Sequence, residues 1–196
     1  MTKIVASDQS LLVASLDPPA APSVGRTVGL RELFEVHAPY VWNSLRRLGV
    51  RASDLEDLTH DLFIEVQRHL GDYDSSRPVR PWLFGFAFRL ASEHRRRAFR
   101  RYEIQASPGD EGVDAAALPD EQLAIRQDRR LVLQALEAID LDRRAVFVLY
   151  EIDGEPMSEI ARSLGIPVNT AYSRLRLART EFANAVKRLA RKDGAR

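Results

Sequence analysis

The chain of 196 residues has no cysteine and four histidines. Without cysteine it forms neither disulfides nor thiolate metal sites, and the histidines are too scattered to make a recognisable set of metal ligands. We therefore expect no bound metal and no cofactor. A protein without disulfides is suited to a reducing compartment, so we expect a cytoplasmic location.

Long apolar runs are missing as well. No stretch approaches the roughly 20 residues that span a bilayer, which predicts no membrane insertion. The apolar patch at 11–16 is short, and Lys3 is the only basic residue near it, with Asp8 between them. This pattern does not fit a signal peptide. Residues 1–27 are rich in proline and small residues, and we expect a disordered N-terminal extension.

Patterns of catalytic residues are absent too. The sequence shows no Ser/His pairing, no catalytic carboxylate cluster and no metal-ligand spacing, so we do not expect an enzyme. The formal net charge is only +1, but the charged residues are unevenly distributed along the chain. Basic blocks at 89–101 and 174–192 flank an acidic stretch. This distribution predicts two separate surfaces for anionic partners.

Helical periodicity dominates the rest of the chain. Leucines and Val66 recur at helical spacing between Asp54 and Leu70, and Pro81 opens a further helix after a turn-rich loop at 71–80. Helices are also expected at 123–139 and 141–152. No strand-rich segment is evident, so the fold class is all-α.

Two small helical domains are expected within this pattern. Residues 103–121 hold six acidic and no basic residues together with proline and glycine, which predicts a flexible acidic linker. The linker separates a domain at 28–102 from a domain at 122–192.

The most informative segment is 155–179, EPMSEIARSLGIPVNTAYSRLRLAR, which predicts a helix-turn-helix. Gly165 closes the first helix, and Pro167 stands near the start of the second, where Asn169 or Thr170 caps the free amides. One stripe of the second helix is apolar, and the opposite stripe carries groups suited to base edges and phosphates. An ordinary helical hairpin with a solvated face is the alternative.

A second motif makes the combination specific. The helix DLEDLTHDLFIEVQRHL at 54–70 is followed by a Tyr-Asp loop and by Arg80-Pro81-Trp82-Leu83-Phe84-Gly85. Together with the linker and the helix-turn-helix, it resembles the small, extracytoplasmic-function (ECF) type of bacterial RNA polymerase sigma factor, over roughly residues 28–190. The resemblance implies a region-two domain at 28–102 and a region-four domain at 122–192. The alternative is a free-standing helix-turn-helix regulator, although no sensing domain is apparent.

The resemblance also implies partners. They are core RNA polymerase, through its clamp helices and flap, promoter DNA, and an anti-sigma factor as a further candidate. Carboxylates at i, i+3, i+7 and i+11 of helix 54–70 form a stripe that is able to pair with basic residues of the polymerase, although a solvated acidic face has the same pattern. The expected polymerase contacts are Asp54, Asp57, Asp61, Phe63 and Glu65.

The region-two domain is expected to bind the minus-ten element as a single strand. Aromatic faces stack on extruded bases and arginines neutralise the backbone. The candidates are Tyr73, Asp74, Arg77, Arg80, Trp82, Arg89, Arg95, Arg96 and Arg97. Trp82 is equally explained as a core residue at a helix start, and Tyr73 as a packing residue of the loop. Phe88 departs from the family pattern and predicts a protein contact at that point.

The region-four domain is expected to bind the minus-thirty-five element. The candidates are Asn169, Thr170, Tyr172, Ser173, Arg174, Arg176 and Arg179. Arg176 lies on the outward stripe and is expected to contact bases, whereas Arg179 lies nearer the core stripe and is expected to contact a phosphate or a structural carboxylate. Asn169 and Leu177 depart from the family pattern, so the promoter sequence stays open.

Overall fold

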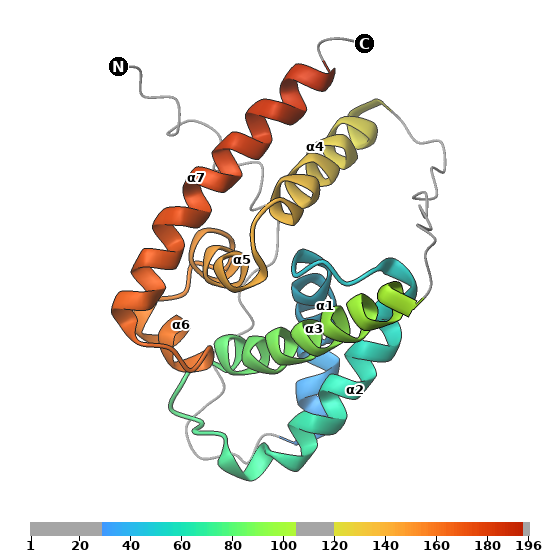
Figure 1. The fold of residues 1–196 in the computed structure, drawn as a ribbon. Helices are drawn as coiled ribbons and strands as arrows, with labels where there is room; N and C mark the ends of the chain where they lie inside the picture. Colours follow the sequence, from blue (N-terminus) through green and yellow to red (C-terminus); the bar gives the residue numbers. More distant parts are fainter. Residues whose placement is uncertain (1–28, 105–119, 194–196) are drawn as a thin grey trace.

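The computed structural model describes residues 29–104 and 120–193, which form seven α-helices and no strand (Figure 1). The first unit consists of α1 (Leu30–Arg47), α2 (Leu55–Arg68) and α3 (Val79–Ile104). Two short 3-10 turns bracket α2. The all-α fold class is therefore confirmed.

Apolar spacing explains the first two helices. In α1, Leu33, Val41 and Leu45 share one buried face, and Gly49 ends the unit with a φ of 92°, a left-handed conformation that favours glycine. In α2, Leu55, Leu58, Leu62 and Val66 are buried at helical spacing, as the periodicity predicts. The helix α3 starts two residues before Pro81, which then lies in the first turn, where proline is tolerated.

The second unit consists of α4 (Asp120–Glu137), α5 (Leu141–Phe147), α6 (Met157–Ser163) and α7 (Val168–Asp193). A π-helical segment, Val148–Ile152, continues α5. The Asp140 carboxylate accepts a hydrogen bond from the backbone N–H of Asp142 and so caps α5.

The helix-turn-helix consists of α6 and α7. Gly165 ends α6 with a φ of 66°, as expected. The helix α7 begins at Val168, so Asn169 and Thr170 lie inside its first turn; the expectation that one of them caps the helix is wrong. Its buried stripe contains Ala171, Leu175 and Ala178, as the sequence predicts.

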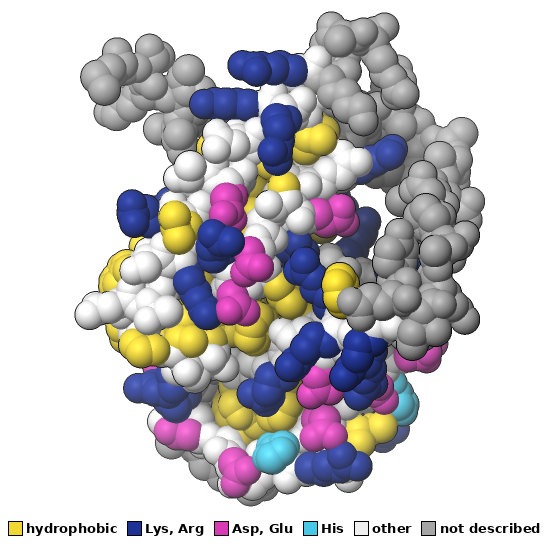
Figure 2. Space-filling view, viewed as in Figure 1, with side chains coloured by type: hydrophobic (Ala, Val, Ile, Leu, Met, Phe, Trp, Pro, Cys, Tyr) yellow, Lys and Arg dark blue, Asp and Glu magenta, His cyan; other side chains and the backbone are white. Residues whose placement is uncertain are grey.

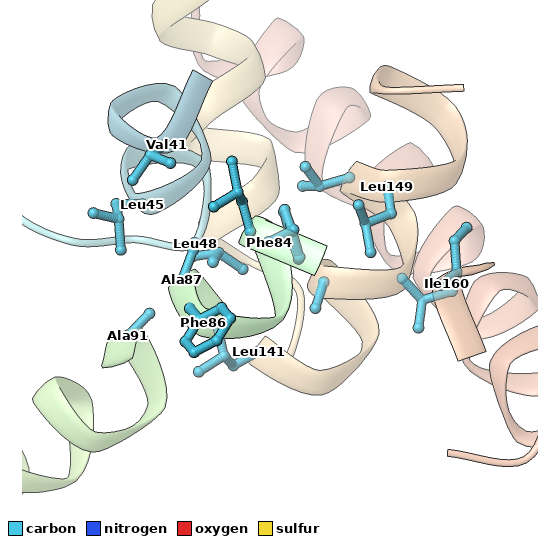
Figure 3. Close-up of a cluster of buried hydrophobic side chains, with 14 of the residues drawn as sticks. Val41, Leu45, Leu48, Phe84, Phe86, Ala87, Ala91, Leu141, Leu149 and Ile160 are labelled. Carbon is cyan, nitrogen blue, oxygen red and sulfur yellow. The ribbon is translucent and has the colours of Figure 1, made fainter. Parts of the chain in front are cut away.

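The two units pack against each other around a continuous apolar core. Figure 3 shows Leu48, which follows α1, and Phe84 of α3 in the same cluster as Leu149 and Ile160 of the second unit. The helices α3 and α6 are in contact, as are α1 and α4. The helix-turn-helix therefore rests on the N-terminal part of α3 (Figure 1).

The predicted linker and N-terminal extension fall largely outside the described residues. The helix α3 reaches Ile104 and α4 begins at Asp120, which trims the expected 103–121 segment at both ends. The domain boundaries, the flexibility of the linker and the disorder of residues 1–27 stay predictions. Within the described ranges, no helix is long and apolar enough to cross a bilayer.

Candidate nucleic-acid interface

The loop before α3 holds an ordered aromatic stack. The ring centroids of Tyr73 and Trp82 lie 4.7 Å apart, and Phe86 meets Trp82 edge-on at 5.1 Å. The Tyr73 hydroxyl donates a hydrogen bond to the carbonyl of Arg77 at 2.7 Å. Tyr73 and Trp82 remain partly exposed. Each ring packs on a neighbour, as the packing alternative predicts, and each side chain stays partly accessible.

Asp74 organises the tip of the same loop. Its carboxylate accepts hydrogen bonds from the Ser76 hydroxyl at 2.6 Å and the Ser76 backbone N–H at 3.0 Å. These hydrogen bonds hold the pKa of Asp74 below its usual value, so it is ionised at neutral pH. This turn fixes the loop before any ligand arrives.

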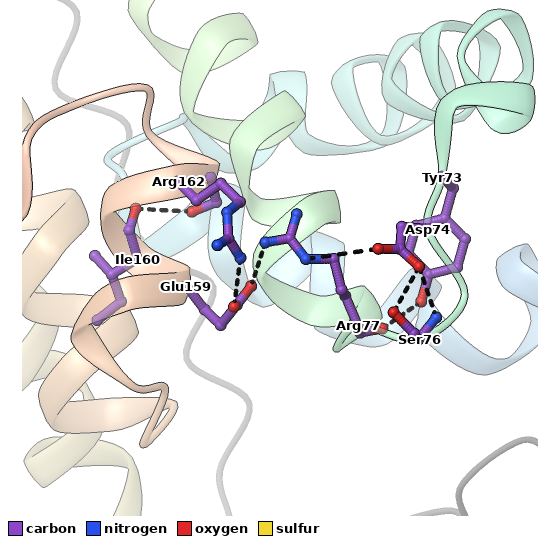
Figure 4. A network of polar contacts seen from close by, with 8 residues as sticks. Tyr73, Asp74, Ser76, Arg77, Glu159, Ile160 and Arg162 are labelled. Carbon is purple, nitrogen blue, oxygen red and sulfur yellow. Dashed lines mark hydrogen bonds and ion pairs between the residues drawn. The ribbon is translucent and has the colours of Figure 1, made fainter.

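Arg77 connects the loop to the helix-turn-helix. Figure 4 shows its guanidinium between two carboxylates, 3.9 Å from Asp74 and 3.5 Å from Glu159 of α6. Glu159 also pairs with Arg162 at 2.7 Å. A cavity of about 310 Å³ lies here, and the aromatic stack forms one wall while α6 forms the other.

The arginines of α3 point mostly to solvent. Arg95 and Arg96 are exposed and form no ion pair within the described chain, while Arg97 pairs loosely with Glu93 at 3.4 Å. Arg89 stacks over the Phe86 ring at 4.5 Å. In Figure 2, basic side chains gather over the C-terminal half of α3.

Arg80 is the exception among the candidates at the start of α3. It is partly buried, and its guanidinium lies 5.4 Å from the centroid of the Tyr40 ring in α1. Further along, the exposed arginines border a cleft of about 810 Å³ between α3 and α5. Phe88 packs against the core and lines this cleft, in agreement with the expected protein contact.

The outward face of α7 is polar and accessible. Tyr172, Ser173, Arg176 and Leu177 are exposed, and Arg176 forms no ion pair in the part of the chain described. The Ser173 hydroxyl donates to the carbonyl of Asn169 at 2.9 Å. Thr170 is half-buried and offers less surface than its neighbours.

Two candidate arginines of α7 are already paired. Arg174 lies 2.7 Å from Asp142 of α5, and Arg179 lies 2.6 Å from Glu151 and stacks beside Tyr150. Glu151 is thus a structural carboxylate partner of Arg179, one of the two kinds of partner expected from the sequence. Both side chains join α7 to the α5 segment, so their first effect is to position the recognition helix.

The acidic face of α2 is only partly free. Asp57 and Asp61 are exposed and make no ion pair with any described residue. Asp54 lies 3.0 Å from His94, and Glu65 pairs with Arg68. Phe63 is 5% exposed and packs edge-on against Phe34, so it offers little surface to a partner in this conformation, and its polymerase contact stays a prediction.

Exposed apolar side chains lie beside the acidic face of α2, and the sequence analysis did not identify them. Ile64 is 40% exposed and Phe34 is 43% exposed. At about 100° per residue, Phe63 lies nearer to the buried stripe of Leu62 and Val66 than Ile64 does. Packing of Phe63 against Phe34 of α1 completes its burial.

Comparison with protein families matches both units. The model for Sigma-70 region 2 matches residues 33–101, and the model for Sigma-70, region 4 matches residues 129–182. The ECF RNA polymerase sigma factor SigL of Mycobacterium tuberculosis is 32% identical over 152 residues, which cover 76% of this chain and 84% of that protein. This chain belongs to the ECF sigma factors.

Other similar proteins agree with this assignment. The RNA polymerase sigma factor CarQ of Myxococcus xanthus is 32% identical over 150 residues, covering 76% of this chain and 84% of CarQ. Two solved structures share the fold. The structure of CnrH in complex with the cytosolic domain of CnrY has a TM-score of 0.57 and 24% identity, and the match covers 83% of this chain and 90% of that chain. The structure of the sigma factor RpoE in complex with the anti-sigma factor NepR from Bartonella quintana has a TM-score of 0.66 and 18% identity, and the match covers 80% of this chain and 96% of that chain.

As a sigma factor, the protein directs RNA polymerase to promoters and takes part in transcription initiation. Sigma factors are DNA-binding initiation factors and in general not enzymes. The free-standing regulator is not favoured. Region 2 corresponds to α1–α3 and carries the aromatic loop, while region 4 holds the helix-turn-helix.

Three charged residues that join the two regions of the sigma factor were missed by the sequence analysis: Arg144, Asp153 and Glu159. Arg144 is 4% exposed, and the Asp153 side chain is 6% exposed. Their partners lie about a hundred residues away in the chain, so local spacing contains no sign of them.

Proposed function

We propose that the loop at 73–77 and the start of α3 bind the unpaired strand of the minus-ten element. The observation that supports this role is the Tyr73–Trp82 stack on a loop that Asp74 has already ordered. Extruding a base costs a few kcal/mol, and stacking on an aromatic face returns about 1 to 3 kcal/mol per base. A preformed loop avoids the entropy cost of ordering it on binding.

The arginines of α3 complete this surface. Arg95, Arg96 and Arg97 are exposed along one helix and follow the phosphate backbone of the opened DNA, while Arg89 and Arg77 border the aromatic stack. Such contacts contribute affinity without sequence preference and weaken with salt. Arg80 contributes from its position over Tyr40.

The helix α7 contacts the minus-thirty-five element in the major groove. Asn169, Tyr172, Ser173 and Arg176 supply the base-directed face, with Thr170 at its edge. Arg174 and Arg179 act through their carboxylate partners by fixing the helix, and their remaining donors face the DNA backbone.

Core polymerase binds the exposed face of α2. Asp57 and Asp61 offer unpaired carboxylates beside Ile64, so the surface combines charge with an apolar centre. Asp54 and Glu65 extend it, although each already has a basic neighbour. We propose that region 4 binds the polymerase flap. We place the protein in the cytoplasm, where polymerase acts.

An anti-sigma factor is the remaining partner. The cleft of about 810 Å³ between α3 and α5 combines arginines with Phe99, which is 65% exposed. Such a surface fits an amphipathic segment with acidic groups. The solved complexes of CnrH with CnrY and of RpoE with NepR show sigma factors with partners bound.

Promoter opening by the holoenzyme tests the role of the loop. Core polymerase with the full chain is incubated with a promoter selected by transcription of genomic DNA, and permanganate detects unpaired thymines. Tyr73→Leu keeps an apolar side chain but lacks the stacking face, and opening falls about tenfold or more. Trp42→Leu, an exposed aromatic of α1 outside the loop, is the matched control. Equal opening by Tyr73→Leu and the wild type would assign Tyr73 to packing alone.

A further inference from the structure

The helix α7 exposes an apolar side chain on its polar outward face. Leu177 is 43% exposed, and Ser173, Arg176 and Thr180 on the same face are polar and exposed as well. At about 100° per residue, Leu177 points roughly 160° away from Leu175 of the buried stripe. Leu177 is also not among the described residues that form or line the continuous apolar core. The side chain therefore does not attach α7 to the rest of the fold.

The hydroxyl groups that flank Leu177 are already bonded to the helix. The Ser173 hydroxyl donates to the carbonyl of Asn169 at 2.9 Å, and the Thr180 hydroxyl donates to the carbonyl of Arg176 at 3.3 Å. Their protons are not available to a base, and both side chains are shorter than leucine. Leu177 is thus the larger group between two small, internally bonded neighbours, and a molecule that approaches this face meets its methyl groups.

The location of Leu177 gives this exposure its meaning. A single exposed leucine on a solvated surface is common and needs no explanation. Leu177, however, directly follows Arg176 and lies one helical turn after Ser173, and both of these belong to the face that we assign to the major groove. When α7 lies in the groove, the Leu177 side chain loses its water and meets the edge of a base pair.

The chemistry of the major groove leaves one good partner for such a side chain. Base edges there present hydrogen-bond donors and acceptors, and the C5 methyl group of thymine is their apolar substituent. A leucine against another base edge takes polar atoms out of water without giving them a partner, which lowers affinity. Leucine therefore favours thymine by contact with the methyl group and disfavours the other bases by desolvation.

The spacing of Leu177 and Arg176 limits where this thymine lies. Adjacent Cα atoms are about 3.8 Å apart, close to the step of about 3.4 Å between stacked base pairs. The two side chains also diverge by about 100° around the helix axis, so they face different base pairs. The thymine is expected within about two base pairs of the position whose preference depends on Arg176.

We propose that Leu177 is a specificity-determining residue of this sigma factor and contacts the C5 methyl group of a thymine in the minus-thirty-five element. This inference rests on the proposed function of α7, and it names the base chemistry that one further side chain of the helix recognises.

Selection from a randomised minus-thirty-five element locates the thymine. Holoenzyme with the full wild-type chain is compared with holoenzyme that contains Leu177→Ala, a change that keeps a strong helix former at an exposed position. The wild type should prefer thymine at one position near the one that Arg176→Ala relaxes, and Leu177→Ala should lose that preference alone. Val186→Ala is the matched control, because Val186 is also 43% exposed on α7. It lies about 180° around the helix from Leu177, so its profile should equal that of the wild type.

Removal of one methyl group tests the contact itself. Deoxyuridine in place of the selected thymine keeps the hydrogen-bonding groups of the base and lacks only the C5 methyl. The affinity of wild-type holoenzyme, measured by fluorescence anisotropy at one fixed salt concentration, should fall about fourfold, as expected for one buried methyl group. Holoenzyme with Leu177→Ala should bind both promoters equally. Leu177→Met keeps an apolar side chain of similar volume and should stay sensitive to the methyl group.

The possible failures are distinguishable. If deoxyuridine weakens wild type and Leu177→Ala by the same factor, another side chain or the DNA shape detects the methyl group, and the inference is wrong. It is also wrong if Leu177→Ala weakens binding to all sequences equally, or leaves the profile unchanged, while Arg176→Ala alters it. The proposed function of α7 then stands. If neither variant alters the profile at any position, α7 contacts no bases and both proposals fail.

Discussion

Charged side chains are used differently in the two regions of the molecule. In region 2, Asp57 and Asp61 on α2 and Arg95 and Arg96 on α3 face solvent without an ion pair among the described residues. In region 4, several arginines have a partner in the chain: Arg143 pairs with Glu181, Arg144 with backbone carbonyls, Arg174 with Asp142 and Arg179 with Glu151.

The difference shows that basic residues of region 4 also serve as ion-pair partners that hold its helices together. Apolar contacts and ion pairs together attach the long helix α7, because α5 and α6 bury Val146, Phe147 and Ile160 beside the ion pairs of Arg174 and Arg179. In region 2, carboxylates of α2 and arginines of α3 stay outside such pairs in the described chain. Arg176, on the outward face of the recognition helix, has no ion pair in the described chain.

The largest expected effect follows from Arg144, the most buried charge of region 4. Arg144→Met should lower the free energy of unfolding by roughly 3 kcal/mol, since it leaves buried carbonyls without donors. Burial, followed by the charge of Arg95, lowers the pKa of Arg144 only to about 10, so the guanidinium is charged at neutral pH. Urea unfolding measures the loss. As a control, Arg96→Met on the surface of α3 should change the free energy of unfolding by less than about 0.5 kcal/mol. Equal losses for the two variants would show that the buried and the exposed arginine do not differ in their contribution to stability.

The acidic face of α2 should affect polymerase binding instead of stability. Asp57→Lys with Asp61→Lys should weaken association with core polymerase by about 2 kcal/mol, or roughly thirtyfold, and leave helical content intact. Fluorescence titration of labelled sigma factor with core polymerase measures the affinity. Glu32→Lys with Glu35→Lys on α1 is a control of equal charge change. Unchanged affinity of the α2 variant would show that Asp57 and Asp61 belong to an ordinary solvated face and do not contact the polymerase.

The two arginines of α7 should separate base contacts from positioning. Arg176→Ala should relax sequence preference at one or two positions of the minus-thirty-five element by about 1 to 3 kcal/mol. Arg179→Ala should weaken binding to all sequences about equally, because the loss of the Glu151 pair loosens the helix. Selection from a randomised upstream element measures both profiles. A sharpened or unaltered profile for Arg176→Ala would show that it contacts no base.

The smallest expected effect is a pH dependence at the interface between the regions. Burial raises the pKa of Asp153 despite Arg47, Tyr40 and Arg80, and the pKa of nearby Glu155 is raised as well. A raised carboxyl pKa in the folded state means that stability falls as pH rises through the window above the ordinary value. Asp153→Asn removes this dependence.

The stability of Asp153→Asn relative to the wild type should therefore be higher at pH 7 than at pH 5. Urea unfolding of both proteins at both pH values measures the difference. A relative stability of Asp153→Asn that rises toward pH 5 would contradict the direction of the shift.

The sequence predicted the helices and much of the surface because these features depend on local spacing. The 54–70 periodicity, the glycines at 49 and 165, and the stripe of Ala171 and Leu175 all appear in the structure at the expected places. Exposure of Tyr172 and Arg176 was predictable for the same reason. The full burial of Phe63 was not, because Phe34, against which it packs, comes from another helix.

The sequence by itself determined the family, the helix boundaries to within a few residues and the kinds of side chain on each helix face. These features are local, because the repeat of 3.6 residues per turn and the turn residues act within one or two turns of helix. Only the tertiary structure decided which charges are free. Arg174, Arg179 and Asp54 have candidate roles by position alone, yet each meets a polar partner from a distant segment. The packing of α6 on Gly85 likewise depends on the approach of two backbones 78 residues apart in the chain, a distance over which sequence pattern contains no geometric information.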